Sequence, residues 1–372
     1  MEKISFLDLG AQQKKIKKKL THNVNNILKN SNYIMGREVK ELEGKLQNYT
    51  KAKFCITCAS GTDALILALL ALKIGRGDKV ICPSFTFPAT AEAILIVGAE
   101  PLFIDVSKDT FNICYLELEK ALEEKNNKIK AIISVDLFGL QANYKRLKKI
   151  ARRYNVHIVS DAAQSFGASF YDKKVGAISD ITCTSFFPAK PLGCYGDGGA
   201  IFTKSKTMKN KLESLRAHGK GKTKYKITDI GLNSRLDTIQ AAILLAKMDV
   251  FDWELNKRNS IASQYTNELK NYFDVPIIPK NTVSAWAQFT LKSNNRKKTL
   301  IFLKEKAIPT MIYYPIPMHM QPAYSIYNNK KFKLTNSISL AKTVFSIPIH
   351  PYLSNSQKEY IIESLKESKK YG

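Results

Sequence analysis

The stretch Ser185-Phe-Phe-Pro-Ala-Lys190-Pro-Leu-Gly-Cys-Tyr-Gly-Asp-Gly-Gly199 carries the features that decide the fold. It begins at the end of an apolar run typical of a buried strand, and a glycine-rich loop follows. Lys190 stands between the two. A second strand end, in Asp161-Ala-Ala-Gln164-Ser-Phe-Gly-Ala168, carries an aspartate. In an α/β sheet, a lysine and an aspartate at two strand ends can hold opposite sides of one flat ring.

Around these segments, apolar strands and amphipathic helices alternate from residue 50 to about 205. Such alternation predicts right-handed crossovers and a mostly parallel, buried sheet. Functional residues are then expected beyond the carboxyl ends of the strands. The expected strands are Phe54–Thr57, Lys79–Pro83, Pro101–Asp105, Ala131–Val135, His157–Ser160, Thr182–Phe187 and Ala200–Thr203. The expected helices are Thr62–Leu72, Ala89–Val97, Tyr115–Glu123 and Tyr144–Tyr154.

The rest of the chain predicts a second domain. Apolar residues at helical spacing indicate a long helix from about Arg235 to Leu255. The remainder has shorter elements and many prolines, which favours a smaller α+β domain. We therefore expect a large domain over residues 1–255 and a small C-terminal domain over residues 256–372.

Composition narrows the class of protein. The 372 residues are enough for a large core, and the hydrophobic content of 44% is ordinary for a globular protein. The net charge of +26 suggests nucleic acid, but the lysines are spread along the chain and no nucleic-acid-binding motif accompanies them. We expect a solvated basic surface and no nucleic-acid partner. Such a surface would also attract a dianionic nucleotide-linked substrate or lie near anionic membrane lipid.

Cysteine usage and the opening segment predict a cytoplasmic protein without a metal site. Cys55 and Cys58 form a lone C-x-x-C, and no second ligand pair stands at zinc spacing, so reduced thiols are expected. The opening Met1-Glu-Lys-Ile-Ser-Phe lacks the pattern of a signal peptide, and no apolar run is long enough to span a bilayer.

Pyridoxal phosphate is the ring that needs both a lysine and an aspartate. Its aldehyde takes a lysine as a Schiff base, and its pyridinium nitrogen needs a carboxylate to stay protonated. We expect Lys190 to be this nucleophile, later freed to move protons between two carbon centres. Asp161 is expected to pair with the ring nitrogen, and Gln164 to contact the ring 3-oxygen. The alternative for Asp161 is a turn cap.

Two further segments predict the remaining contacts to the cofactor. Ser60-Gly61-Thr62 follows a strand and opens a helix, where free N–H groups bind anions such as phosphate. A plain helix cap is the alternative. Ser185 is placed to donate to the same phosphate. Phe87, with Phe85 as second choice, is expected to lie flat on the ring, the alternative being a core phenylalanine.

Together these motifs, with Gly231-Leu-Asn-Ser-Arg-Leu-Asp-Thr-Ile-Gln-Ala-Ala242, resemble the DegT/DnrJ/EryC1/StrS family of nucleotide-sugar aminotransferases. The resemblance spans essentially the whole chain. It implies the pyridoxal phosphate fold type I of aspartate aminotransferase and a homodimer with two active sites at the interface. It also implies that Asn233 reaches the cofactor phosphate of the partner subunit, and that Arg235 meets an anionic part of the cofactor or substrate.

The resemblance also suggests the reaction. Relatives that dehydrate the sugar carry histidine in place of the lysine, so Lys190 favours transamination, with L-glutamate as donor and 2-oxoglutarate as product. The motifs are most similar to those of enzymes that aminate C3 of UDP-linked 2-acetamido-3-keto hexoses or hexuronates for surface polysaccharide or lipopolysaccharide. Tyr313 departs from the glucuronate enzymes, where histidine is expected. The segment His319-Met-Gln-Pro-Ala323 resembles enzymes of dTDP-3-keto-6-deoxyhexoses.

The sugar contacts are expected from polar residues near the end of the chain. Tyr314, His319 and His350 are the candidates, each with ordinary packing as the alternative. The lysine-rich loop at 218–226 is expected either to clamp the substrate diphosphate or to be solvated. A non-catalytic binding or regulatory protein with the same fold is the alternative from another class, and a sugar dehydratase is a third.

Overall fold

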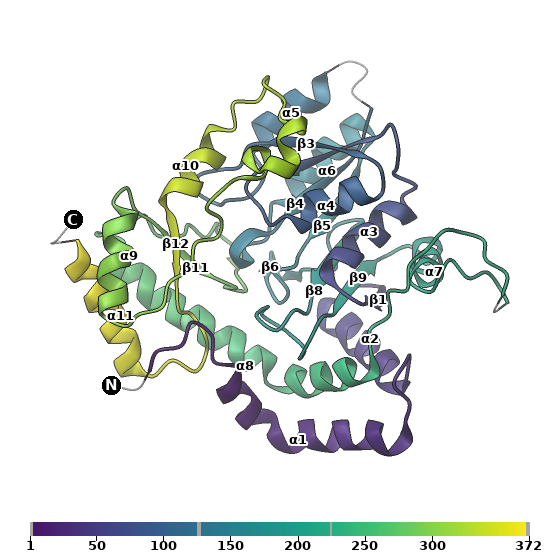
Figure 1. Cartoon of the computed structure of the whole chain (residues 1–372), viewed down its shortest axis with the longest axis horizontal. Coiled ribbons are helices and arrows are strands. Elements are labelled where there is room, and N and C mark those ends of the chain that lie inside the picture. Colours follow the sequence, from purple (N-terminus) through teal and green to yellow (C-terminus); the bar gives the residue numbers. More distant parts are fainter. Residues whose placement is uncertain (1–2, 125–127, 224, 370–372) are drawn as a thin grey trace.

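A seven-stranded sheet forms the centre of the computed structural model, which describes residues 3–124, 128–223 and 225–369 (Figure 1). The first two residues of the opening segment and the last three of the chain therefore lie outside the described residues. β9 runs antiparallel to its two neighbours, and all other neighbouring pairs are parallel. In spatial order the strands are β1 (Phe54–Cys58), β9 (Gly199–Thr203), β8 (Ile181–Ser185), β5 (His157–Asp161), β4 (Ile129–Val135), β2 (Lys79–Pro83) and β3 (Glu100–Ile104).

The sheet confirms the expected mostly parallel α/β fold, and its strands are the seven that the apolar runs predicted. The expected helices are also present, within one or two residues at each end. The helices of this part are α2 (Arg37–Thr50), α3 (Gly61–Ala71), α4 (Ala89–Ile96), α5 (Tyr115–Glu123), α6 (Tyr144–Tyr154) and α7 (Lys206–Leu215). A short 3-10 turn, Leu137–Gly139, follows β4.

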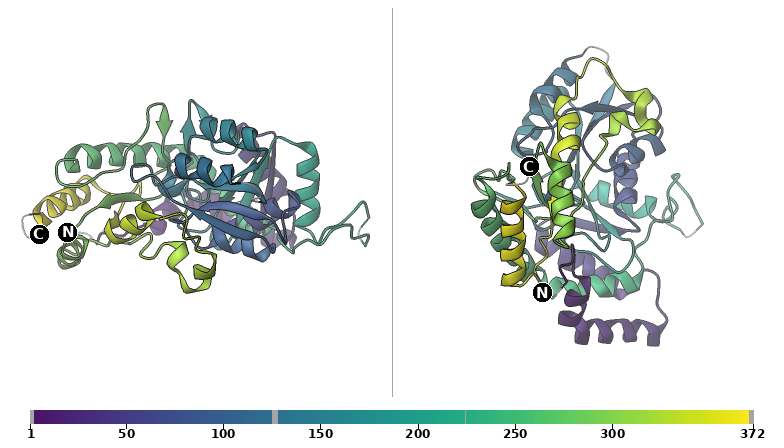
Figure 2. Two further views of the ribbon diagram at one scale, coloured as in Figure 1. Left: turned by 90° about the horizontal axis from the view of Figure 1, so that it is seen from above. Right: turned by 60° about the vertical axis from the view of Figure 1, so that its left-hand side comes forward.

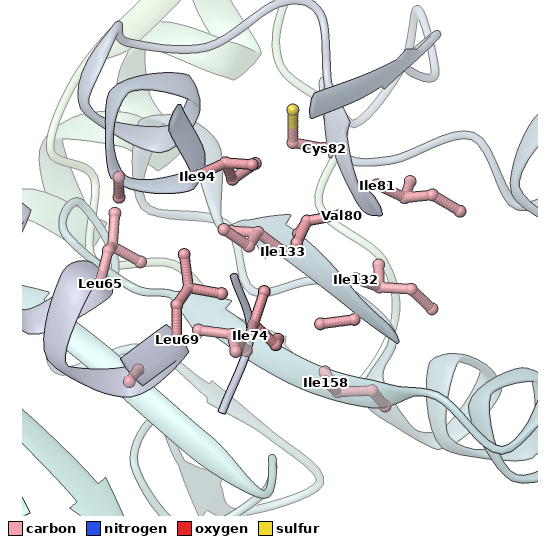
Figure 3. Packing of buried hydrophobic residues seen from close by; sticks show 14 of the residues in the cluster. Leu65, Leu69, Ile74, Val80, Ile81, Cys82, Ile94, Ile132, Ile133 and Ile158 are labelled. Carbon is pink, nitrogen blue, oxygen red and sulfur yellow. The ribbon is translucent and has the colours of Figure 1, made fainter. Parts of the chain in front are cut away.

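Helices cover both faces of the sheet, because side chains of a strand alternate between faces. Ile56 of β1 joins a hydrophobic cluster that contains residues of α3 and α6. Its neighbour Cys55 joins a second cluster, which contains residues of α2. Figure 3 shows part of the first cluster, where Leu65 and Leu69 of α3 lie on the side chains of the strands. Each fully buried leucine contributes about 1.5–3 kcal/mol to folding, so this double-sided burial stabilises the sheet.

The long helix α8 (Thr238–Leu269) connects the sheet to the C-terminal part of the chain. It extends well beyond Leu255, where the sequence predicted its end. The reason is a change of packing partner: Leu244 and Phe251 pack in the second sheet cluster, whereas Ile261 and Tyr265 pack in the C-terminal cluster. The expected boundary after residue 255 thus falls inside a continuous helix, and the division into two domains stays a proposal.

The C-terminal part is built on the antiparallel pair β11 (Phe289–Lys292) and β12 (Val344–Ile347). Phe289 and Phe345 of these strands share a hydrophobic cluster with Ile4 from the start of the chain. Figure 2 shows the N-terminal segment beside the C-terminal helix, and Gln357 Nε2 there donates to the carbonyl oxygen of Lys3 at 3.4 Å. The helices are α9 (Arg296–Glu305), α10 (Thr335–Thr343) and α11 (Asn355–Ser368), with 3-10 turns at Met318–Met320 and Pro322–Tyr327.

The remaining elements are short or lie outside these layers. α1 (Leu9–Asn30) packs along α8, with Ile16 and Leu20 against Ile243 and Ala246 (Figure 1). Three two-residue strands, β6 (Ser169–Phe170), β7 (Lys173–Lys174) and β10 (Thr282–Val283), form a small separate sheet. Over the described ranges, none of the helices is long and apolar enough to cross a bilayer.

Candidate active site

Asp161 is the last residue of β5, at the carboxyl end of the sheet. Thr90 Oγ1 donates to its Oδ2 at 2.9 Å, and the main-chain N–H of Ala163 donates to its Oδ1 at 3.2 Å. Burial raises the pKa of the Asp161 carboxyl above its usual range, while Thr90, Ala163 and the charge of Lys190 act in the opposite direction. The site therefore holds a buried carboxylate that is stabilised by two donors and by the charge of Lys190.

Lys190 lies five residues beyond the end of β8, the strand next to β5. Burial lowers the pKa of its ammonium group, and the charge of Asp161 partly opposes this effect. A lysine that loses its proton more readily is a better nucleophile toward an aldehyde. The structure thus brings together the two residues that the sequence singled out: Asp161 at the end of β5, and Lys190 in the loop that follows the neighbouring parallel strand β8.

The start of α3 lies directly against Ser185. Ser60 is the N-cap of this helix, and its hydroxyl accepts the N–H of Asp63 at 3.0 Å. A Cβ added to Gly61 would stand 2.6 Å from the Cβ of Ser185, so only glycine fits between the two segments. Gly199 repeats this close approach, since its Cβ would stand 2.4 Å from the carbonyl oxygen of Ser60. Ser60, Gly61 and Ser185 are therefore neighbours at a helix N-terminus, which suits a phosphate group.

A buried ion pair stabilises the segment that leads into the N-terminus of α3. Arg216 donates through one guanidinium nitrogen to Glu43 Oε1 at 2.7 Å and to the main-chain oxygen of Thr57 at 2.7 Å. Both charged side chains are largely buried. Thr57 is the residue before the end of β1, so the pair anchors the strand that leads into Ser60.

The two phenylalanines after β2 differ in exposure, which distinguishes their roles. Phe85 is fully buried in the core, whereas Phe87 is 53% exposed. The Phe87 ring lies 6.0 Å from that of Tyr314, measured between centroids. The Tyr314 hydroxyl accepts from Gln164 Nε2 at 3.1 Å, and Gln164 Oε1 accepts the N–H of Phe138 at 2.6 Å. Phe87 is therefore the one with an open face, and Tyr314 contacts both Phe87 and Gln164.

The two histidines expected near the sugar are both buried. Nδ1 of His319 lies 2.6 Å from Ser84 Oγ, at the end of β2, and burial lowers its pKa. His350 contacts the carbonyl oxygen of Ser5 through Nε2 at 3.1 Å, in a small cavity that Lys190 also lines. Burial lowers the pKa of His350 to about 4, and the charge of Arg258 adds to this effect. Both rings are therefore neutral at neutral pH and could contact a sugar only as neutral hydrogen-bonding groups.

The segment expected to reach a partner subunit lies next to Ser60, Gly61 and Ser185 of its own chain, which together form the candidate phosphate cradle. Ser234 Oγ accepts the N–H of Ala59 at 3.2 Å, and the neighbouring Asn233 is exposed. Arg235 is half-buried, and among the described residues its Nε has no hydrogen-bond partner. Lys222 and Lys226 of the lysine-rich loop are exposed, and residue 224 of this loop lies outside the described residues.

Sequence reasoning missed several residues that hydrogen-bond to the candidate site residues or to the segments that carry them. Thr90 is one of them, although its hydroxyl one residue after the start of α4 was a usable signal. Ser84, Asp136 and Ser165 gave no signal of this kind, because their side-chain partners lie in other segments of the chain: His319 for Ser84, and Ser165 for Asp136. Across the described ranges, no group of three or more His, Cys, Asp and Glu residues could hold a metal ion.

The donor set fits pyridoxal phosphate. A lysine with a lowered pKa and a buried carboxylate suit the aldehyde and the ring nitrogen. The helix N-terminus in the cradle at Gly61 suits a phosphate group, and a Cβ at Gly61 would meet Ser185. With the mostly parallel sheet, this arrangement defines a pyridoxal phosphate-dependent enzyme of fold type I.

The chain belongs to the DegT/DnrJ/EryC1/StrS aminotransferase family, whose model matches residues 14–366. It is 42% identical over 363 residues to UDP-2-acetamido-2-deoxy-3-oxo-D-glucuronate aminotransferase of Pseudomonas aeruginosa, covering 97% of this chain and 99% of the relative. It is 37% identical over 370 residues to dTDP-3-amino-3,6-dideoxy-alpha-D-galactopyranose transaminase of Aneurinibacillus thermoaerophilus, covering 99% of both chains.

Solved structures agree with this assignment. A DegT DnrJ EryC1 StrS aminotransferase from Brucella abortus matches with a TM-score of 0.96 and 44% identity, covering 98% of this chain and 99% of that chain. The ntda protein of Bacillus subtilis, solved with the cofactor pyridoxamine phosphate (PMP) bound, matches with a TM-score of 0.92 and 27% identity over 100% of this chain and 86% of that chain. The protein is therefore an aminotransferase, and its cofactor is pyridoxal phosphate.

Proposed function

We propose that this enzyme converts a nucleotide-linked ketosugar to the aminosugar with L-glutamate as donor. The proposed substrate is a UDP-linked 2-acetamido-2-deoxy-3-keto hexose or hexuronate, aminated at C3. The observation that carries the reaction class is that the charges of Lys190 and Asp161 interact, beside the carboxyl ends of the neighbouring strands β8 and β5. The substrate class is supported by the 42% identity to the P. aeruginosa enzyme over nearly the whole chain.

The residues divide the work according to their chemistry. Pyridoxal phosphate, when bound, supplies an electron sink for the carbanion that transamination creates. Lys190 would bind the aldehyde covalently and, once displaced by the donor amine, carry a proton between the donor carbon and the sugar carbon. Asp161 would hold a proton on the ring nitrogen through a charge-assisted hydrogen bond. The hydrogen bond from Thr90 would favour the ionised form of that carboxylate and orient it.

Other residues would bind and orient the cofactor. The N-terminus of α3, with Ser60, Gly61 and Thr62, and the hydroxyl of Ser185 would hold the phosphate. Phe87 would cover one face of the ring, which its 53% exposure supports. Gln164 would donate to the ring 3-oxygen through the amide nitrogen that now donates to Tyr314.

The substrate would approach from the side of Tyr314, which adjoins Gln164 and Phe87. Tyr314, His319 and His350 are the proposed sugar contacts, and Arg235 would meet an anionic group of substrate or cofactor. The half-buried Arg235 with its unpartnered Nε supports that assignment.

The proposed enzyme is a homodimer in which Asn233 of one subunit contacts the cofactor phosphate of the other. The exposure of Asn233 beside the cradle supports this arrangement. We also propose a cytoplasmic location, supported by six free cysteines, and a role in surface polysaccharide or lipopolysaccharide biosynthesis, supported by the motif resemblance.

Amination of a dTDP-linked 3-keto-6-deoxyhexose is the second candidate function. It is supported by the 37% identity to the A. thermoaerophilus transaminase and by the segment from His319 to Ala323. The nucleotide and the group at C2 are the features in which the two candidate substrates differ.

An amination screen tests the proposal. UDP- and dTDP-linked 3- and 4-ketosugars are offered with glutamate, and products are identified by mass. We expect an aminosugar from a UDP-linked 2-acetamido-3-ketosugar. Exclusive turnover of a dTDP sugar would favour the second candidate. Borohydride-reduced protein is digested in parallel, and a cofactor adduct on any residue other than Lys190, or no adduct, would contradict the proposed chemistry.

A further inference from the structure

Asp136 is a second buried carboxylate beside the proposed cofactor site. It directly follows β4, the neighbour of β5, and its main-chain N–H donates to the carbonyl oxygen of Asp161 at 3.0 Å. Its side chain is completely buried. The proposed reaction gives this carboxylate no task, since the ring nitrogen takes only one partner.

Three uncharged donors converge on this carboxylate. Oδ1 accepts the N–H of Ala142 at 2.9 Å and the hydroxyl of Tyr144 at 2.8 Å, and Oδ2 accepts the hydroxyl of Ser165 at 2.9 Å. Burial raises the pKa of Asp136 to about 7, the three donors lower it, and the charge of Asp161 raises it. A buried carboxylate without hydrogen-bond donors would be costly, so each of these bonds contributes to the stability of the fold.

The contact to Ser165 links Asp136 to the turn that carries the ring-facing residues. This turn begins at Asp161, includes Gln164 and is closed by the N–H of Ser165, which donates to the carbonyl oxygen of Ala162 at 3.1 Å. Two further hydrogen bonds join this turn to the segment that follows β4. The Asp136 N–H donates to the carbonyl oxygen of Asp161, and the Phe138 N–H donates to Gln164 Oε1 at 2.6 Å. A shift of Ser165 would therefore move Gln164 and strain Asp161.

We propose that Asp136, acting through Ser165, is a positioning residue that holds Asp161 and Gln164 in place against the cofactor ring. This inference rests on the proposed function, because it takes these two residues as the ring contacts. Functional groups must be held within about 0.5 Å of the productive geometry, which requires support from residues behind them. Asp suits this role better than Asn because both of its oxygens accept hydrogen bonds.

Tyr144 provides a matched control within the same network. Its hydroxyl donates to the same carboxylate, but it comes from α6 and also lies 2.5 Å from Ser160 Oγ inside β5. Tyr144→Phe therefore removes a donor from Asp136 and leaves the link between Asp136 and Ser165 in place. Ser165→Ala removes that link, and both substitutions delete a single hydroxyl oxygen that donates to Asp136.

The experiment compares the apoproteins of the wild type, S165A, Y144F and D136N. Melting temperatures and pyridoxal phosphate dissociation constants are measured, the latter by fluorescence titration, together with the pH dependence of the visible absorption band of the loaded proteins. We expect S165A and Y144F to lower the melting temperature. We expect only S165A and D136N to weaken cofactor binding, by about 10-fold, and to move the titration midpoint of the band.

Equal cofactor affinity and equal spectra in S165A and Y144F would overturn the inference, and this comparison does not require D136N to fold. Where D136N folds, the double variant D136N/S165A should bind the cofactor no more weakly than D136N, because both changes break one link. The wild type separates the two proposals. If borohydride reduction of the wild type gives no adduct on Lys190, the proposed function is contradicted. If the adduct is on Lys190 but S165A and Y144F bind the cofactor equally well, only this inference is contradicted.

Discussion

The hydroxyl of Thr90 donates to Oδ2 of Asp161 at 2.9 Å, joining the start of α4 to the end of β5 across the sheet edge. Both side chains are buried. This bond favours the ionised carboxylate in a place where burial alone would favour the neutral acid. The position of the first turn of α4 therefore affects the negative charge on Asp161, which the proposed reaction needs.

Removing this hydroxyl should shift the pH dependence of the reaction. A hydrogen bond to the charged form lowers a carboxyl pKa, so Thr90→Val should raise the pKa of Asp161 further. The acidic limb of kcat/KM should then move toward higher pH, as measured by steady-state rates over a pH series. Thr184→Val is the control, since its buried hydroxyl donates to the main-chain oxygen of Ala162 instead of a carboxylate. An identical limb in both variants would disprove this role for Thr90.

Lys190→Ala should abolish glutamate-dependent turnover. General acid–base catalysis by one side chain is worth about 10²- to 10⁴-fold, so a loss of at least this size is expected in kcat. The apoprotein should still bind the cofactor, because the phosphate cradle and Asp161 are unchanged. Single-turnover rates and cofactor titration measure the two effects. Lys149→Ala, at an exposed position on α6, should leave both unchanged. Near-normal turnover in Lys190→Ala would refute the assigned role.

Gly61→Ala should weaken cofactor binding strongly. The new methyl group would stand 2.6 Å from the Cβ of Ser185, so the start of α3 must shift away from β8 and open the proposed phosphate cradle. Gly44→Ala is the matched control, because nothing lies within 4 Å of a Cβ added there. That change should stabilise the protein by about 0.4–1 kcal/mol. Fluorescence titration of the apoproteins with pyridoxal phosphate checks both, and equal affinity would exclude the cradle as the phosphate site.

His350 should make the folded state less stable at acidic pH. Its pKa is about 4 in the folded protein, below its value of 6.5 in the absence of burial, so the unfolded chain binds a proton more readily. The stability that the neutral ring contributes is therefore present above pH 6.5 and is lost as the pH falls toward 4. Between pH 7 and pH 5 the loss should be roughly 2 kcal/mol in the free energy of unfolding.

Urea unfolding at a series of pH values measures this effect. His350→Asn should flatten the pH dependence over that window, whereas His22→Asn, at an exposed position, should retain it. A slope that is unchanged in His350→Asn would show that another group is responsible for the acid sensitivity.

Local sequence predicted the strands of the central sheet and the pair of Lys190 and Asp161. The strands are continuous apolar runs because both faces of the sheet are buried, and such runs are visible without tertiary information. The pair was visible because a lysine before a glycine-rich loop and an aspartate at a strand end are rare features that one cofactor explains. The full length of α8 was not visible, because its buried stripe changes partner between Phe251 and Ile261.

The sequence by itself thus determined the residues proposed to carry the chemistry and the order of the elements that bear them. Only the tertiary structure decided that Phe87 and not Phe85 has an open face, and that Thr90, Asp136 and Ser165 stand behind Asp161. The physical reason is that these relationships join segments far apart in the chain. Their contacts exist only once β2, β4 and β5 lie side by side in the sheet.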